Sequence, residues 1–295
     1  MFDYLIKNGQ LIDGTGSPAY RADVGIANGR IAAISDLQTA PAGTVIDAAG
    51  KYVTPGFIDI HRHADAAVFR PGFGELELKQ GLTTIVNGNC GLSVTPCRGA
   101  FQKEIQAYLT PITGALPEDK DFSSLEAYLK AAEAEPRRIN TAMLTGSGTI
   151  RACAAGFGVP ELDRVHLKTV HELLEQELAA GALGVSLGLG YAPDCFYSTE
   201  ELIEALRPLT NSGIPITVHM RQEGSGVVDA LREMITVAKA LHTTVEISHL
   251  KSIGKANWRR CTPEMLRLMG QARQEGIRIA CDVYPYTAGS TQLVH

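Results

Sequence analysis

Two histidines separated by one residue, His61 and His63, are the first part of the sequence that could do chemistry. They follow the apolar run 57–60, which the turn pair Pro55-Gly56 precedes and which predicts a short buried strand. Alternate side chains of a strand share a face, so these two imidazoles can point to one place. Neutral imidazole nitrogens are common zinc ligands. The pattern therefore predicts a metal site, and two surface histidines in a polar loop are the alternative.

Three further potential ligands, Cys90, His219 and His249, come at the ends of later apolar runs. Taken singly, each has a plainer explanation, since a lone cysteine is usually a small buried apolar residue and a histidine at a strand end often only bonds a loop. Their shared position changes this interpretation, because the carboxyl ends of the strands of a barrel meet at one mouth. Four histidines and a thiolate gathered there could hold two metal ions that activate a water molecule.

Two weaker signals lie close to these residues. Lys251 is two residues after His249, so it could share the histidine's face and offer a cation to an anionic substrate. A surface ammonium is the alternative. The stretch 184–191 is rich in glycine but matches neither a phosphate-binding loop nor a dinucleotide-binding turn. It predicts a strand followed by a flexible loop over the mouth.

Alternating strands and helices must position these side chains. Seven apolar runs follow Pro55, at 57–60, 83–86, 141–144, 183–187, 214–218, 245–247 and 277–283. Helical patterns lie between most of them, so residues 56–295 predict an α/β fold with a parallel sheet. This many repeats favour a (β/α)8 TIM-like barrel over a doubly wound sheet, and no glycine fingerprint follows the first strand. About seven strands are present, so we expect an incomplete barrel.

Several helix ends can be read from capping signals. Ser198-Thr199-Glu200-Glu201 has capping-box spacing and opens a helix over 202–209. Thr262-Pro263 supplies an N-cap and a first-turn proline for a helix over 264–274. The longest predicted helix covers 161–180, and Gly181 stands where a left-handed cap is needed.

Residues 1–55 predict a small β-sandwich segment. Short apolar runs alternate with turn signals, and the dipeptides Asn8-Gly9 and Asn28-Gly29 favour the tight turns of hairpins. A segment this short has few residues for a core of its own, so we expect it to depend on its neighbour.

Composition excludes several classes of function. The 295 residues carry a net charge of -5 without a basic stripe, which argues against nucleic acid as a partner. No apolar run is long enough to cross a membrane. Six cysteines are scattered without paired spacing and no signal peptide is evident, so we expect reduced thiols and a cytoplasmic location. These features leave the oligomeric state open.

The sequence resembles the amidohydrolase superfamily and, within it, the N-acyl-D-amino-acid deacylases (D-aminoacylases). The resemblance runs through the whole chain. Its most specific part is Gly88-Asn89-Cys90-Gly91, because hydantoinases and dihydroorotases instead place a modified lysine on strand four, and 182–191 contains no lysine. The other matching stretches are 53–63, 181–189, His219-Met220-Arg221, Ser248-His249-Leu250-Lys251 and 284–290.

The resemblance implies roles for particular residues. Cys90, His219 and His249 would hold one tightly bound Zn²⁺, and His61 and His63 would line a second, weaker metal position. The positions expected to bind the carboxylate of the substrate, an N-acyl-D-amino acid, are Lys251, Tyr284 and Ser290. The implied reaction is hydrolysis of the amide bond to a carboxylate and a D-amino acid.

Two departures from the family pattern qualify this expectation. The family has a histidine where this chain has Ser147, and a serine cannot replace an imidazole as a ligand or proton carrier. The family also uses an aspartate on strand eight as its proton shuttle, and no such residue is found here, so no catalytic acid–base residue is assigned. We therefore expect a truncated chain that is poorly active alone. A cyclic amidase of the hydantoinase or dihydroorotase type and an inactive metal-binding fragment are the alternatives.

Overall fold

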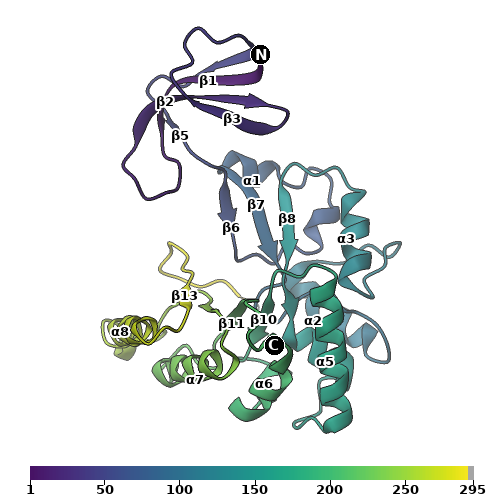
Figure 1. The fold of residues 1–295 in the computed structure, drawn as a ribbon. Helices are drawn as coiled ribbons and strands as arrows, with labels where there is room; N and C mark the ends of the chain where they lie inside the picture. Colours follow the sequence, from purple (N-terminus) through teal and green to yellow (C-terminus); the bar gives the residue numbers. More distant parts are fainter. Residues whose placement is uncertain (292–295) are drawn as a thin grey trace. The chain divides into compact units, whose positions relative to one another are not determined.

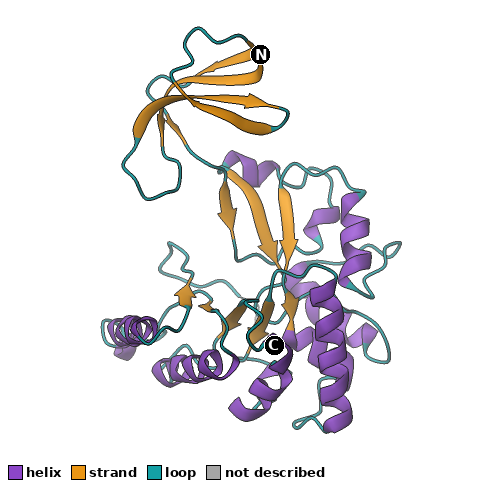
Figure 2. Cartoon of the chain, viewed as in Figure 1, coloured by secondary structure: helices purple, strands orange, loops and turns teal. Residues whose placement is uncertain are grey.

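The computed structural model describes residues 1–291, and the chain divides into two compact units, Met1–Phe57 and Ile58–His295. Figure 1 traces the two units along the chain, and Figure 2 separates their helices and strands by colour. The first unit is made of strands and the second alternates strands with helices. All candidate ligands lie in the second unit.

The first unit is one five-stranded sheet in the order β3-β2-β1-β4, with β5 paired to β1. The strands are β1 (Phe2–Leu11), β2 (Tyr20–Ala27), β3 (Arg30–Ser35), β4 (Ala42–Asp47) and β5 (Tyr52–Val53). As expected, Asn28 and Gly29 form the turn of the β2–β3 hairpin, with φ of 54° and 69°.

The prediction of a hairpin at Asn8-Gly9 is wrong. Both residues lie inside β1, where the pairing with β2 shifts between Ile6 and Gly9. Asn8 adopts a φ of 66°, and its N–H donates to the Asp23 carboxylate at 2.9 Å instead of to the ladder. The dipeptide therefore supplies the positive φ of a bulge, because a carboxylate on the neighbouring strand satisfies the displaced N–H.

Seven strand positions follow one another in sequence order in the second unit. They are β6 (Phe57–Asp59), β7 (Leu82–Asn87), β8 (Asn140–Met143) continued by β9 (Thr145–Gly146), β10 (Val185–Gly188), β11 (Ile216–His219), β12 (Val245–Ile247) and β13 (Ile279–Cys281). Only Leu144 separates β8 from β9. Its N–H donates to Asn87 O at 2.9 Å, which holds this residue beside the end of β7. The neighbours from β7 to β13 run parallel.

The predicted α/β fold with about seven strands is confirmed. Among residues 1–291 the strands of this unit form two sheets, β6-β7-β8 and β9-β10-β11-β12-β13, and no strand pairs with the outer edge of β6 or β13, so no closed barrel is formed. Each of the seven apolar runs contains a strand, although several strands are shorter than the run that predicted them. Parallel strands that are covered on both faces consist of nearly continuous apolar runs, so these strands can be recognised in the sequence.

Eight α-helices connect the strands of the described part of this unit. They are α1 (Glu75–Lys79), α2 (Gln102–Thr113), α3 (Leu125–Glu133), α4 (Ser147–Ala155), α5 (Arg164–Ala179), α6 (Thr199–Ala205), α7 (Val227–Leu241) and α8 (Cys261–Gln274). In Figure 1, α5 to α8 lie along the outer side of β10 to β13. Within residues 1–291 no helix has the length and apolar character needed to cross a membrane.

Capping explains where the helices begin. Ser198 caps α6 by accepting from Glu201 N–H at 3.1 Å, as the capping box predicts. The longest helix, α5, begins later than predicted because Asp163 is its N-cap. Thr262 is not an N-cap: α8 already begins at Cys261, and Thr262 and Pro263 lie inside its first turn.

The main hydrophobic core lies between β10–β12 and helices α5–α8. Side chains from three consecutive strands are fully buried in it: Val185, Leu187, Ile216, Val218, Val245 and Ile247. Burial on this scale holds each strand in one register, and register fixes which residue stands at its carboxyl end. The core therefore positions the chemistry at the strand ends.

Replacing Ile216 of β11 by alanine will lower the free energy of unfolding by about 2–5 kcal/mol, because the side chain is 0% exposed and its loss leaves a cavity. Ile58 on the outer strand β6 is 62% exposed, so Ile58→Ala is the matched control and will cost about 0.5 kcal/mol or less. Urea unfolding followed by circular dichroism measures both. Equal losses would mean that the core is not where the fold places it.

Candidate metal centre

Five side chains from four strand ends converge on one point. Their ligand atoms form two groups of three, His61 with His63 and Cys90, and Cys90 with His219 and His249, each within 4.8 Å. Cys90 Sγ belongs to both groups and lies 3.3 Å from His61 Nε2 and 3.7 Å from His249 Nε2. The five candidate ligands expected from the sequence are thus brought together, with the sulfur at the centre.

Strand topology explains the convergence. His61 and His63 follow β6, Cys90 follows β7, His219 is the last residue of β11 and His249 follows β12. Each residue therefore stands at the carboxyl end of its strand, where barrels carry their chemistry. Cys90 and His219 are 129 positions apart in the sequence and become neighbours because the carboxyl ends of β7 and β11 face the same point.

The Asn89-Cys90-Gly91 turn places the thiol. Asn89 is buried, and its side-chain amide donates to Ile60 O at 3.1 Å and to Val86 O at 3.0 Å, which ties the ends of β6 and β7 together. Cys90 has a φ of 58°, in the left-handed region that a residue with a Cβ seldom adopts. Such backbone strain concentrates at functional sites.

Gly91 follows at a φ of 73° and is packed on all sides. A Cβ at this position would lie 2.7 Å from Gly188 N and 2.9 Å from Asp194 Oδ2. Its N–H donates to Ser186 Oγ at 2.9 Å. The glycine is therefore required by space as well as by φ, which gives the Asn-Cys-Gly motif a physical basis.

The glycine-rich stretch 184–191 supports the centre from beside it. A Cβ at Gly188 would lie 2.4 Å from Cys90 O, and one at Gly190 would lie 2.9 Å from His219 Nε2. Tyr191 donates its hydroxyl to Cys90 O at 2.5 Å. The expected flexible loop over the mouth is instead a packed support, in which glycines make room for the cysteine carbonyl and the histidine ring.

Two carboxylates that the sequence analysis missed bond the histidines. Asp282, directly after β13, accepts from His61 Nδ1 at 2.8 Å, and its other oxygen accepts from His249 N–H. Glu223 lies 2.9 Å from His249 Nδ1. Asp282 could have been found, because it is an acidic residue at the end of the seventh apolar run. Glu223, four residues after His219, carries no such signal.

The electrostatics favour a thiolate among cationic imidazoles. Burial alone would raise the pKa of Cys90, but hydrogen bonds from the four surrounding histidines hold it well below its usual value. Burial would lower the pKa of His61 and His249, yet contacts with Asp282 and Cys90 raise that of His61 to about 10, and contacts with Cys90 and Glu223 raise that of His249 to about 9. A bound cation would replace these protons.

The expected substrate-binding residues are only partly assembled. Lys251 Nζ contacts Glu223 Oε1 at 2.5 Å and lies 5.8 Å from the centre of the Tyr284 ring. Ser290 is exposed, and its side chain forms no hydrogen bond or ion pair with either residue in the described part of the chain. Ser147, which stands where the resemblance expected a histidine, donates to the buried Asp194 at 3.1 Å. It contacts none of the five candidate ligands.

The donor set suits a metal ion. Three or more imidazole nitrogens and a thiolate are ligands that zinc prefers. His63 Nδ1 is buried and has no hydrogen-bond partner among the described residues. A buried polar atom without a partner is costly, and a cation offers such a group compensation. The residues present therefore fit zinc.

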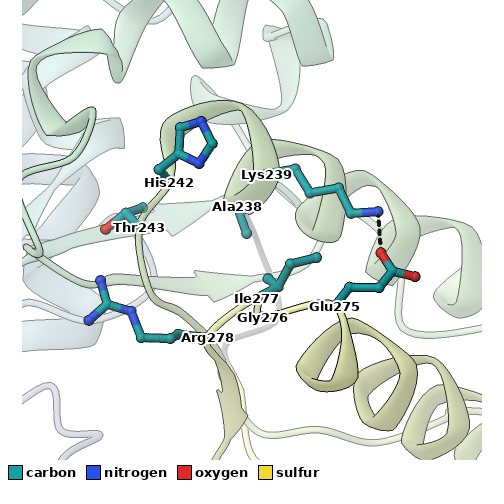
Figure 3. Close-up of a pocket in the computed structure, with 8 residues that line it drawn as sticks. All are labelled: Ala238, Lys239, His242, Thr243, Glu275, Gly276, Ile277 and Arg278. Carbon is teal, nitrogen blue, oxygen red and sulfur yellow. Dashed lines mark hydrogen bonds and ion pairs between the residues drawn. The ribbon is translucent and has the colours of Figure 1, made fainter.

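A pocket of about 330 Å³ lies elsewhere in this unit (Figure 3). Its lining comes from the end of α7 and from the segments before β12 and β13, and it includes the ion pair of Lys239 with Glu275. His242 and Arg278 also face it in Figure 3. Since this is the amino end of the strands, the pocket is separate from the candidate metal centre.

Comparison with known proteins finds relatives over nearly the whole chain. The model of the Amidohydrolase family matches residues 44–137. A D-aminoacylase of Alcaligenes xylosoxydans xylosoxydans is 39% identical over 99% of this chain and 59% of its own length. The chain thus spans about three fifths of that relative.

Two solved structures share the fold closely. The N-acyl-D-glutamate deacylase of Bordetella bronchiseptica, complexed with zinc and a phosphonate mimic of the tetrahedral intermediate, is 34% identical with a TM-score of 0.88, over 97% of this chain and 59% of its own. A D-aminoacylase with a binuclear metal centre is 36% identical with a TM-score of 0.87, over 98% of this chain and 60% of its own.

Gly91→Ala will disturb the metal centre, whereas Gly99→Ala will not. Both glycines have a positive φ, 73° and 77°, so both variants lose about 1–2 kcal/mol to backbone strain. Only at Gly91 would the new Cβ meet other atoms, since nothing lies within 4 Å at Gly99. We expect zinc affinity, measured by competition with a chelator, to fall about tenfold or more in Gly91→Ala alone. Equal affinities in the two variants would contradict the packing argument.

Proposed function

We propose that the chain is an amidohydrolase whose metal centre serves hydrolysis of the amide bond of N-acyl-D-amino acids, which yields a carboxylate and a D-amino acid. One observation carries the proposal: two groups of three ligand atoms share Cys90 Sγ. A shared ligand between two groups is what a pair of neighbouring metal positions requires. The thiolate character of Cys90 supports the same assignment.

The proposed ligand roles follow the geometry. Cys90, His219 and His249 would hold the tightly bound zinc, and His61 and His63 would line the second, weaker position next to it. Zinc supplies Lewis acidity toward an amide carbonyl and lowers the pKa of water to about 7. The chain's own part is to hold five ligand side chains at fixed strand ends, so that little reorganisation accompanies the reaction.

Lys251 and Tyr284 would receive the carboxylate of the substrate, with Ser290 as a third partner. Lys251 Nζ is already held by Glu223 and stands over the Tyr284 ring, so the ammonium is oriented before a substrate arrives. An ammonium is a point charge that attracts a carboxylate strongly. Preorganisation of this kind lowers the entropic loss on binding.

Protonation of the leaving amine needs an acid within hydrogen-bond reach. The resemblance assigned this role to an aspartate of an eighth strand, and residues 1–291 contain no strand beyond the seventh position. The roles proposed for the described residues are therefore metal binding and substrate binding, and no acid for the leaving amine is assigned among them.

A cyclic amidase is the alternative hydrolase. The absence of lysine from β10 (Val-Ser-Leu-Gly) and the central position of Cys90 Sγ favour the linear-amide assignment, since the cyclic amidases are expected to use a modified lysine at strand four.

Cys90→Ala will abolish tight metal binding. The variant removes the only atom that both ligand groups share, so both are incomplete. Cys153→Ala is the matched control, because its thiol donates to Arg98 O and belongs to neither group. Metal content after gel filtration, measured by inductively coupled plasma mass spectrometry, should approach zero in Cys90→Ala and stay at the unsubstituted level in Cys153→Ala. Retained zinc in both variants would refute the cysteine-bridged centre.

The zinc-loaded chain is expected to hydrolyse N-acetyl-D-methionine and to leave N-acetyl-L-methionine and hydantoins unchanged. Lys251→Met should raise KM with a smaller effect on kcat, because it removes a charge that binds substrate. Lys255→Met is the control for a lysine outside the site. Ring opening of a hydantoin would favour the cyclic amidase. Stoichiometric zinc without hydrolysis of any acyl-amino acid would favour a metal-binding chain without catalysis.

A further inference from the structure

We propose that Asp282 is the positioning residue of the metal centre, which keeps the proton of His61 on Nδ1 and so presents Nε2 as the ligand atom. This inference rests on the proposed metal-dependent function. Asp282 lies directly after β13, and its side chain reaches the end of β6, where it meets His61. Both side chains are mostly buried, with 17% and 18% exposure for His61 and Asp282.

The direction of the hydrogen bond fixes the ring atoms. A carboxylate can only accept, so His61 Nδ1 donates to Asp282 Oδ2 across 2.8 Å. The other ring nitrogen, Nε2, faces Cys90 Sγ at 3.3 Å. A neutral imidazole that keeps its proton on Nδ1 has its free lone pair on Nε2, next to the sulfur. A carboxylate behind a ligand histidine commonly sets the tautomer in this way.

The backbone around Asp282 keeps its carboxylate in place. Its N–H donates to Ile247 O at 3.1 Å, and its carbonyl accepts from Leu250 N–H at 2.9 Å. The backbone of Asp282 is thus hydrogen-bonded to β12 and to the segment that follows it. Its second carboxylate oxygen accepts from the backbone N–H of His249, which has a φ of 41°. One side chain thus fixes the ring of one candidate ligand and the backbone of another.

The carboxylate next to His249 does not define a tautomer in the same way. His249 Nδ1 lies 2.9 Å from Glu223 Oε1 and 3.0 Å from Lys251 Nζ. The carboxylate favours a proton on Nδ1, whereas the ammonium favours a lone pair there. Of these two pairs, Asp282 with His61 is the one in which a single acceptor faces a single ring N–H. It is therefore the better pair with which to test the control of a tautomer.

Asp282→Asn is the decisive variant, because asparagine keeps the shape and removes the charge. Its oxygen can still accept from His249 N–H, and its NH₂ group then faces His61 Nδ1 as a donor. If the amide were turned the other way, its NH₂ group would face the N–H of His249, and two donors would then oppose each other. The neutral His61 ring must then carry its proton on Nε2, which blocks that atom as a ligand. We expect zinc affinity to fall about 10–100-fold.

Two readouts other than activity measure this effect. Chelator competition gives the zinc affinity, and ¹⁵N-histidine NMR of the zinc-loaded protein reports which His61 nitrogen carries the proton. The unsubstituted chain should show a His61 Nδ1–H protected from exchange with solvent, and Asp282→Asn should lack it. A role limited to stability would lower the melting temperature without moving the proton from Nδ1 to Nε2.

Glu177→Gln is the matched control. Glu177 is a buried carboxylate on α5 that accepts from Thr95 Oγ1 at 2.9 Å and from Leu125 N–H at 3.1 Å, and its side chain hydrogen-bonds none of the five candidate ligands. Its zinc affinity should stay within about threefold of the unsubstituted chain, below the range expected for a positioning residue. If the unsubstituted chain binds no zinc, the proposed function fails and the positioning role falls with it, whereas zinc bound with the His61 proton on Nε2 overturns the inference alone.

The inference is overturned if Asp282→Asn and Glu177→Gln bind zinc equally well, or if His61 carries its proton on Nε2 in the unsubstituted zinc-loaded chain. Should Asp282→Asn not fold, the NMR measurement on the unsubstituted chain decides alone.

Discussion

One sulfur atom organises the second unit of this protein. Cys90 Sγ is the atom common to both ligand groups, and its residue is held in a left-handed backbone conformation that its own Cβ disfavours. The surrounding residues compensate for this strain: Asn89 ties two strand ends together, and Gly91 fills a space that admits no Cβ. The thiol is therefore in place before any ligand arrives, and the histidines are arranged around it.

The order and register of the strands place the other candidate ligands. Buried apolar runs fix the register of β10, β11 and β12, and register sets which residue stands at each carboxyl end. The two outer strands, β6 and β13, pair with no strand along their outer edges in the described part of the chain. The contact of His61 with Asp282 joins the residues that follow these two strands, beside the metal centre.

Much of this arrangement could be predicted from the sequence, because seven apolar runs and five strand-end ligands are local signals. Asp282 carries the local signal of an acidic residue at a strand end and Glu223 carries none, but the role of both depends on which ring nitrogen they meet in space. The Asn8-Gly9 error has a similar origin: the dipeptide signals a positive φ, and only the Asp23 carboxylate on the next strand decides between a turn and a bulge. The sequence shows that 184–191 is rich in glycine, but the close approach of Gly188 to Cys90 and of Gly190 to His219 depends on the tertiary structure.

The most direct test of the central claim is X-ray absorption at the zinc edge of the metal-loaded chain. We expect one sulfur ligand at about 2.3 Å from the zinc together with histidine nitrogens at about 2.0–2.1 Å from it. A spectrum with nitrogen and oxygen ligands and no sulfur would show that Cys90 does not bind the metal, and the centre described around it would have to be abandoned.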